Sequence, residues 1–290
     1  MKKKIDLSPL WIAIAGVLWG FMGLFIRRFS EYGVESMSVV FLRSLFTAAA
    51  ALMFCFVTDR KSLRIKLKDI WIFIGTGLGS IVFFNYCYFT AINMMSLSAA
   101  AILLYTSPIF VTVLSAVIFK ERITPKKIIA VVLSVGGLVL VTGIIGSGTP
   151  VSGLGIAFGI MSAIGYALYS IFTRFAINRG YSSFVCIGYS FLFAAVFSAF
   201  FADMNAIGDM LSSSPSMIGF TVIFTIVSSI APYFLYNLGL KGTENGKAAV
   251  IASVEPVAAT VLGILLYNEI PTPSAAIGII LVFAAMILSI

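Results

Sequence analysis

The sequence contains no histidine and only three cysteines. Without histidine, the chain lacks the side chain that most often binds metals or transfers protons near neutral pH. Cys55, Cys87 and Cys186 stand singly inside apolar stretches, so their spacing fits neither a disulfide framework nor a metal site. We therefore expect no metal ion and no cofactor.

Charged residues are also scarce, at 10% of 290 residues, whereas 60% of the residues are hydrophobic. A soluble domain has about 25% charged and about 45–50% apolar residues. A water-soluble fold could not bury so much apolar surface, so lipid must be the main solvent. Ten membrane-spanning helices of about 20 residues each would use about 200 of the 290 residues and leave only short loops.

Ten apolar runs, separated by charged or turn-forming clusters, predict ten helices. Each run is continuous and far longer than the alternating strands of about 10 residues that build membrane β-barrels. The predicted fold is therefore an all-α polytopic membrane protein. The predicted spans are 9–29, 36–57, 69–91, 97–118, 127–145, 153–175, 182–202, 215–238, 247–267 and 274–290.

The net charge of +8 is distributed unevenly along the chain. Sixteen of the 19 Lys and Arg residues lie at the N-terminus or in the loops on its predicted side of the membrane. Arg27 and Arg28 lie in the opposite loops, and Arg43 lies inside a span. Because cytoplasmic loops carry the excess of Lys and Arg, both termini are predicted to be cytoplasmic. The positive charge thus sets orientation, and no nucleic-acid partner is expected.

The first span follows three lysines and could be mistaken for a cleaved signal peptide. The small residues Ala13 and Ala15 fall inside the apolar run, where a cleavage site would be premature. We therefore expect a retained first helix in a multi-pass protein of the inner (plasma) membrane.

The two halves of the chain share markers at a nearly constant separation. The first and sixth spans align at an offset of 146 residues, and the later spans align at an offset of 148. Since each half holds five spans, an odd number, the second half enters the membrane from the opposite side. This predicts two inverted five-helix repeats, 1–145 and 146–290, as in secondary transporters. The matched pairs at an offset of 148 are Tyr88 with Tyr236, Pro108 with Pro256, Glu121 with Glu269 and Pro125 with Pro273.

Several segments resemble the EamA-type signature of the drug/metabolite transporter superfamily. The resemblance covers nearly the whole chain and includes Trp19-Gly20 and Arg43. It implies a ten-helix transporter of small metabolites, commonly amino acids and often an exporter, similar to bacterial aromatic amino-acid exporters. Other relatives carry nucleotide sugars or sugar phosphates, but this chain lacks the cluster of intramembrane bases that a phosphate would favour. The segments are 101–108, 120–125 and 135–141 in the first half and 253–256 and 268–272 in the second.

Arg43 and Glu255 are the ionisable residues that lie deep inside predicted spans. They lie about 12 Å and about 13 Å from opposite helix ends, near the middle of a hydrocarbon core of about 30 Å. Such residues are costly and usually functional. We expect both in a central cavity, where Arg43 binds a carboxylate and Glu255 an ammonium. Alternatively, they form a structural ion pair, or Arg43 reaches the outer headgroups.

Aromatic and amide side chains deep in the spans form a second candidate group. A buried phenol, indole or amide needs a hydrogen-bond partner, so several of them can line a substrate pocket. For any single residue, helix packing or a place in an interfacial belt is the competing interpretation. The candidates are Trp19, Asn85, Tyr86, Tyr88, Tyr105, Tyr166, Tyr169, Tyr189, Tyr233, Tyr236 and Asn237.

Three prolines interrupt predicted spans. Pro108, Pro232 and Pro256 each remove a backbone hydrogen bond to the carbonyl four residues earlier. Such carbonyls are tolerated where they line a cavity. The prolines are candidate hinges for alternating access, or else static kinks.

The leading hypothesis is a secondary transporter that exports amino acids or related amphipathic compounds by alternating access, not an enzyme. Glu255 is the deep carboxylate that could carry a proton, which makes H⁺ the candidate coupling ion. Uptake by the same fold is the first alternative. A membrane-embedded lipid-modifying enzyme would need clustered polar groups near one membrane face, and the short loops do not supply them. The expected partners are a small-molecule substrate and the lipid bilayer, with the chain as a monomer or homodimer.

Overall fold

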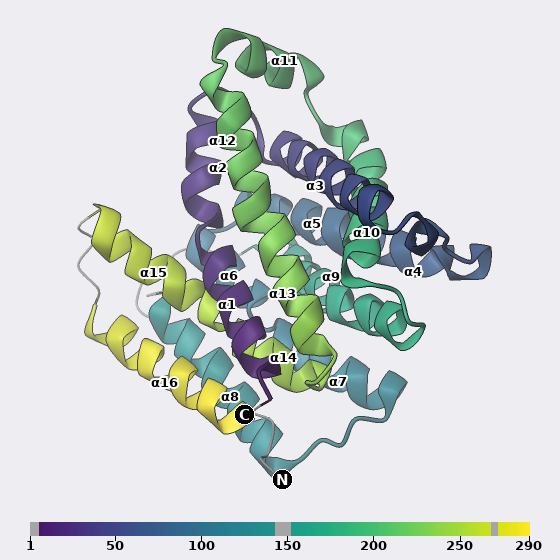
Figure 1. The fold of residues 1–290 in the computed structure, drawn as a ribbon. Coiled ribbons are helices and arrows are strands. Elements are labelled where there is room, and N and C mark those ends of the chain that lie inside the picture. Colours follow the sequence, from purple (N-terminus) through teal and green to yellow (C-terminus); the bar gives the residue numbers. More distant parts are fainter. Residues whose placement is uncertain (1–5, 143–151, 268–271) are drawn as a thin grey trace.

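A computed structural model describes residues 6–142, 152–267 and 272–290. Within these residues the secondary structure is entirely helical, which confirms the all-α prediction. Figure 1 shows the helices as one bundle in which they cross at various angles. Glu269 lies outside the described residues, so its predicted match with Glu121 stays a prediction.

The chain forms the following elements, in which η3 and η5 are π-helical and the other η elements are 3₁₀ turns. The first half contains α1 (Ser8–Gly20), α2 (Met22–Ser30), α3 (Ser36–Thr58), η1 (Arg60–Leu63), η2 (Leu67–Asp69), α4 (Ile70–Ile74), η3 (Gly75–Val82), α5 (Phe83–Ile92), α6 (Leu97–Leu104), α7 (Ser107–Phe119) and α8 (Pro125–Val141). The second half contains α9 (Gly153–Asn178), α10 (Ser183–Ser198), η4 (Ala199–Phe201), α11 (Met204–Ser213), α12 (Ser216–Thr225), η5 (Ile226–Ile230), α13 (Ala231–Leu240), α14 (Asn245–Ala252), α15 (Val254–Tyr267) and α16 (Pro273–Ser289).

Eight helical segments of the described chain are long and apolar enough to cross a membrane. The two helices α8 and α16 have 17 residues each, the lower end of the range for a membrane span. The count of ten spans stays a prediction that depends on these two helices. The eight segments are Ser8–Ser30, Ser36–Thr58, Leu67–Ile92, Leu97–Phe119, Gly153–Asn178, Ser183–Phe201, Ser216–Leu240 and Asn245–Leu266.

Hydroxyl caps and prolines determine where several helices begin. Thr124 accepts a hydrogen bond from the backbone N–H of Lys127, and Pro125 opens α8. Thr272 and Pro273 repeat this arrangement at the start of α16. A proline in the first helical turn costs no hydrogen bond, because that N–H has no partner inside the helix. The same Thr-Pro pair therefore starts the last helix of each half.

The spans that the sequence predicts as continuous are interrupted at matched places. Pro108 has no N–H for the carbonyl of Leu104, and α6 ends at that residue. Pro256 has the same relation to Ala252, where α14 ends. The π-helical stretch η5 maps onto positions 78–82 at the 148-residue offset, inside η3. These interruptions thus recur at equivalent positions in the two halves, whereas the break between α1 and α2 has no counterpart in the continuous α9.

Helix packing follows the same correspondence. Helix α1 packs against α13, and α5 packs against α9. Helix α3 packs against α10, and α8 packs against α16 at the lower left of Figure 1. The predicted repeat pairs α1 with α9 and α5 with α13, so exchanging the two halves converts the α1–α13 contact into the α5–α9 contact. The α3–α10 and α8–α16 contacts each join a span to its own counterpart and are unchanged by the exchange.

Helix α11 is an element that the hydrophobic runs do not predict. It lies across one end of the bundle in Figure 1 and begins where Asp203 accepts hydrogen bonds from two backbone N–H groups. Its buried residues Ile207 and Met210 pack in a cluster with Phe29 and Phe224. With only 10 residues and one apolar face, it lacks the long hydrophobic run on which span prediction depends.

Two neighbouring glycines give a test of the α8–α16 contact. A Cβ at Gly137 would lie 2.7 Å from the carbonyl oxygen of Gly278, whereas a Cβ at Gly136 would meet nothing within 4 Å. Gly137→Ala is expected to destabilise the protein by about 1–3 kcal/mol through overpacking. Gly136→Ala is expected to be neutral or stabilising, since alanine is the better helix former. Thermal unfolding in detergent measures both, and equal midpoints would contradict this packing.

Candidate functional site

A cavity of about 50 Å³ lies inside the bundle and is lined by residues of α1, α2, α3, η3, α5, α9, α13 and α15. Its walls bring together residues from both halves of the chain. The volume is enough for a few water molecules, so a metabolite would need the walls to move apart. The predicted site residues that line it are Trp19, Arg43, Tyr166, Tyr169, Tyr233, Tyr236 and Glu255.

Helix α9 supplies three hydroxyl groups to the cavity from one face, at positions 166, 169 and 170. The Tyr166 hydroxyl donates to Oε2 of Glu255 over 3.1 Å. The Tyr169 hydroxyl donates to Oδ1 of Asn237 over 3.0 Å. The hydroxyls of Ser170 and Tyr236 share a hydrogen bond of 2.6 Å. Helix α9 is thereby tied to α15 and α13 through the cavity wall.

Aromatic rings from α1, α9 and α13 form the apolar part of the wall. The Trp19 ring lies 5.1 Å from the Tyr233 ring and 5.4 Å from the Tyr236 ring, measured between centroids. The Tyr169 ring meets Tyr233 edge-on at 4.8 Å. Edge-to-face contacts of this kind fix ring orientation and add to the energy of burial.

Arg43 is 2% exposed and has few partners for a buried cation. Its NH1 donates to the sulfur of Met22 over 3.4 Å, and its Nε has no hydrogen-bond partner among the described residues. The indole Nε1 of Trp19 likewise has no hydrogen-bond partner among the described residues. Two donors in the cavity wall therefore lack a hydrogen-bond acceptor, in a cavity that also contains the Glu255 carboxylate.

Glu255 lines the same cavity and is held from two directions. Its carboxylate accepts the hydrogen bond from Tyr166, and its backbone is packed against α1. A Cβ at Gly20 would lie 2.8 Å from the carbonyl oxygen of Glu255, so glycine permits the close approach. None of the ion pairs between described residues includes Arg43 or Glu255. The cavity thus contains both charges without pairing them directly.

The other predicted site residues lie outside the cavity wall. Asn85 is buried and donates to the carbonyl of Ile81. Tyr86 is 43% exposed on the outside of the bundle, because its neighbour Asn85 takes the inward side of α5. The half-buried Tyr88 and Tyr105 pack in separate apolar clusters. Asn237 is buried behind Tyr169, and Tyr189 donates to the carbonyl of Leu63.

The three candidate hinge prolines are buried at the interruptions described above. Pro108 and Pro256 lie in the first turn of α7 and α15, the second segments of the fourth and ninth spans, and Pro232 follows the π-helical stretch η5. Movement at these positions stays a prediction.

Sequence reasoning missed five residues of the cavity wall. Three of them are apolar and do not differ in type from packing residues, and Ser80 is a small residue inside an apolar run. Ser170 could have been found, because it lies one helical turn from Tyr166 on the same face. The missed residues are Met22, Ser80, Ile81, Phe84 and Ser170.

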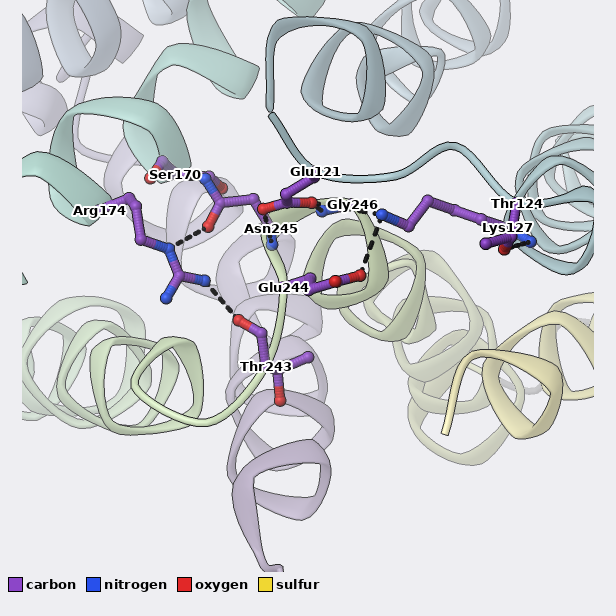
Figure 2. A network of polar contacts seen from close by, with 9 residues as sticks. All are labelled: Glu121, Thr124, Lys127, Ser170, Arg174, Thr243, Glu244, Asn245 and Gly246. Carbon is purple, nitrogen blue, oxygen red and sulfur yellow. Dashed lines mark hydrogen bonds and ion pairs between the residues drawn. The ribbon is translucent and has the colours of Figure 1, made fainter. Parts of the chain in front are cut away.

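A network of polar contacts closes one end of the bundle near the cavity (Figure 2). Glu121 accepts hydrogen bonds from the backbone N–H groups of Asn245 at 2.9 Å and Gly246 at 3.4 Å. The carboxylate thus caps the N-terminus of α14, where a negative charge is favourable. Lys127 joins the network, with Nζ 3.3 Å from Glu121 and 3.1 Å from Glu244. These contacts join the first half of the chain to the second.

Arg174, on the side of α9 that also carries Ser170, holds the other side of this network. Its Nε donates to Oδ1 of Asn245 over 2.8 Å, and its two terminal nitrogens donate to the carbonyls of Leu240 and Thr243. Asn245 Nδ2 donates to the carbonyl of Ser170 over 3.4 Å. The Arg174 guanidinium thus donates to three acceptors and has a structural role, whereas Arg43 forms no ion pair.

Known proteins match this chain over nearly its full length. The EamA-like transporter family matches residues 7–143 and 153–290. An uncharacterized transporter of Archaeoglobus fulgidus is 30% identical, over 96% of this chain and 94% of its own. Solute carrier family 35 member G1 of Homo sapiens is 21% identical, over 93% of this chain and 76% of its own. One solved crystal structure superposes with a TM-score of 0.78 at 21% identity, covering 97% and 95% of the two chains, and shows the fold alone.

The buried Arg43 and the half-buried Arg174 give a test of which one is structural. Arg43→Met removes a buried charge that forms no ion pair among the described residues, so the unfolding midpoint is expected to stay the same or rise. Arg174→Met leaves three acceptors unpaired, at about 1–3 kcal/mol for each that is buried, and is expected to lower the midpoint by about 5 °C or more. Thermal unfolding in detergent compares them. An equal loss in both variants would show that Arg43 holds the fold together.

Proposed function

Since the chain belongs to the EamA-like transporter family, we propose that it exports amino acids or related small zwitterions through the cavity between Arg43 and Glu255. It is a multi-pass membrane transporter whose relatives are named as transporters. The proposed substrate class, direction and mechanism follow from the cavity, the packing of the two halves and the placement of charge.

The observation that carries the proposal is the pair of unlike charges in one buried cavity, with no ion pair between them. A buried charge without a direct ion pair is costly. A zwitterion compensates both at once, because its carboxylate accepts from Arg43 and Trp19 while its ammonium donates to Glu255. A purely anionic or cationic solute would satisfy one of the two and leave the other unpaired.

The aromatic rings favour a substrate with an apolar or aromatic side group. The rings of Trp19, Tyr169 and Tyr233 surround the space beside the charged groups. An aromatic face attracts both apolar atoms and ammonium groups. In this arrangement the carboxylate of the zwitterion contacts Arg43, its ammonium contacts Glu255, and its side group contacts the rings.

Transport requires the cavity to open to each side in turn. The helix contacts stay the same when each span is replaced by its counterpart in the other half. This supports two inverted repeats that swap conformations. The interruptions before Pro108 and Pro256, together with η3 and η5, are the proposed points of bending. A relative shift at these points would widen a cavity that is now only about 50 Å³.

The network around Glu121 is the proposed cytoplasmic gate. It joins the loop after α7, the loop after α13 and the end of α9, all on the side predicted to be cytoplasmic. While these contacts hold, the halves stay together at that end. Opening toward the cytoplasm therefore requires α14 to leave the Glu121 carboxylate.

The proposed energy source is a substrate or ion gradient, with a proton on Glu255 as the candidate. The Tyr166 hydroxyl donates to the Glu255 carboxylate. A protonated carboxyl would give up its attraction for an ammonium, which couples proton binding to substrate release.

The transport prediction uses purified protein in liposomes and a screen of labelled amino acids, with and without a pH gradient. At least one amino acid is expected to cross. Arg43→Gln and Glu255→Gln are each expected to raise KM about tenfold or more, because a hydrogen bond to a charged group is worth about 1.5–3 kcal/mol.

The controls are Arg28→Gln, a surface pair with Glu31, and Tyr86→Phe, on the outside of the bundle. Both are expected to transport normally. If no small metabolite moves under any gradient, or if the controls lose as much as the cavity variants, the proposed site is wrong. Loading the label inside or outside the liposomes determines the direction.

The gate prediction uses Ser170→Cys as a reporter in a background where the three native cysteines are alanine. Glu121→Gln removes the charge that binds Lys127 and caps α14, so a maleimide applied from the cytoplasmic side is expected to label the reporter faster. Glu31→Gln, which removes an exposed carboxylate elsewhere, is the control and should not change the rate. Faster labelling from the opposite side alone would contradict this assignment.

A further inference from the structure

Helices α7 and α8 are neighbours in sequence but pack mainly against other helices. Helix α7 packs against α9 and α14, and α8 packs against α16. The space between them is a groove of about 500 Å³. Its walls include Ile109 and Val113 from α7, Ile123 from the connection, and Ile128, Val132 and Gly136 from α8.

The groove is apolar and open to the surroundings of the bundle. Ile109, Val113 and Val132 are 41%, 50% and 64% exposed. On α8 the lining positions recur at three- and four-residue spacing from 128 to 136, which makes one continuous stripe. In a membrane protein such a groove faces acyl chains rather than water.

The end of the groove at the α7–α8 connection is basic. Lys120, Arg122 and Lys126 are exposed there. The acid in this stretch, Glu121, is already bound by Lys127 and by the N-terminus of α14. Its charge is therefore compensated, and the three exposed bases remain available at the membrane surface.

The distance along α7 from the groove residue Ile109 to the basic end matches one leaflet. From Ile109 to Lys120 the chain advances 11 residues, about 16 Å at 1.5 Å per residue. Half of a hydrocarbon core of about 30 Å is about 15 Å. A chain lying in the groove would reach from the bilayer centre to the headgroup level, where the three bases are.

We propose that this groove binds an acyl chain of an anionic phospholipid from the leaflet on the basic side, whose phosphate meets Arg122 and Lys126. Basic residues at the membrane surface attract anionic headgroups by about 1 kcal/mol each. The charge also opposes a second copy of this chain as the occupant. A two-fold dimer along this groove would bring two sets of the same bases together.

The first experiment compares binding of phosphatidylglycerol and phosphatidylcholine to the purified protein by native mass spectrometry. Wild type is expected to retain phosphatidylglycerol preferentially. The double variant Arg122→Gln/Lys126→Gln is expected to lose that preference by about tenfold or more. The matched control is Lys61→Gln/Arg64→Gln, which removes the same two residue types from another exposed loop predicted on the same side.

The second experiment fills the groove without disturbing the helix contact. A Cβ at Gly136 meets nothing within 4 Å, so Gly136→Leu is expected to fold and to displace the bound lipid. Gly219→Leu, at an exposed glycine of α12 with equally open space, is the control.

Equal binding of both lipids by wild type, or equal loss in the control variants, would overturn the proposal. So would a change from dimer to monomer in Gly136→Leu without loss of lipid, which would assign the groove to a second copy. Transport is not measured in either experiment, so their failure is distinct from failure of the proposed export.

Discussion

The cost of an unpaired charge inside a bilayer is the constraint on which this structure depends. Arg43 is buried and forms no ion pair among the described residues, and the carboxylate in the same cavity, Glu255, accepts a hydrogen bond from a tyrosine hydroxyl instead. A fold that needed only stability would pair these charges or replace them with apolar residues. The family shows that the chain is a transporter. In the proposed function, a solute that carries both complementary charges binds Arg43 and Glu255 at once.

Helix α9 connects this cavity to the closed end of the bundle. Tyr166 contacts Glu255, Ser170 contacts both Tyr236 and Asn245, and Arg174 contacts Asn245. The backbone N–H of Asn245 in turn donates a hydrogen bond to the Glu121 carboxylate. A continuous set of hydrogen bonds therefore runs from the proposed substrate site to the proposed gate. The proposed site and the proposed gate therefore share one helix.

Sequence reasoning located what depends on hydropathy and on residue type. The all-α fold followed from the apolar runs, and Arg43 and Glu255 followed from their depth in those runs. What it missed depends on helical phase and on contacts distant in sequence. Tyr86 and Tyr166 look alike in an apolar run, yet one faces outward and the other lines the cavity. The contact between Arg174 and Asn245 joins residues 71 positions apart, and no local pattern indicates it.

Equilibrium binding of substrate analogues to the purified protein tests the central claim most directly. The ligands are a transported amino acid, its carboxamide, which lacks the carboxylate, and its des-amino acid, which lacks the ammonium. Both analogues are expected to bind wild type about tenfold or more weakly. In Arg43→Gln the penalty for the carboxamide should largely disappear while that for the des-amino acid remains, and in Glu255→Gln the reverse should hold. Analogues that bind wild type as tightly as the amino acid, or penalties unchanged by the variants, would contradict the account.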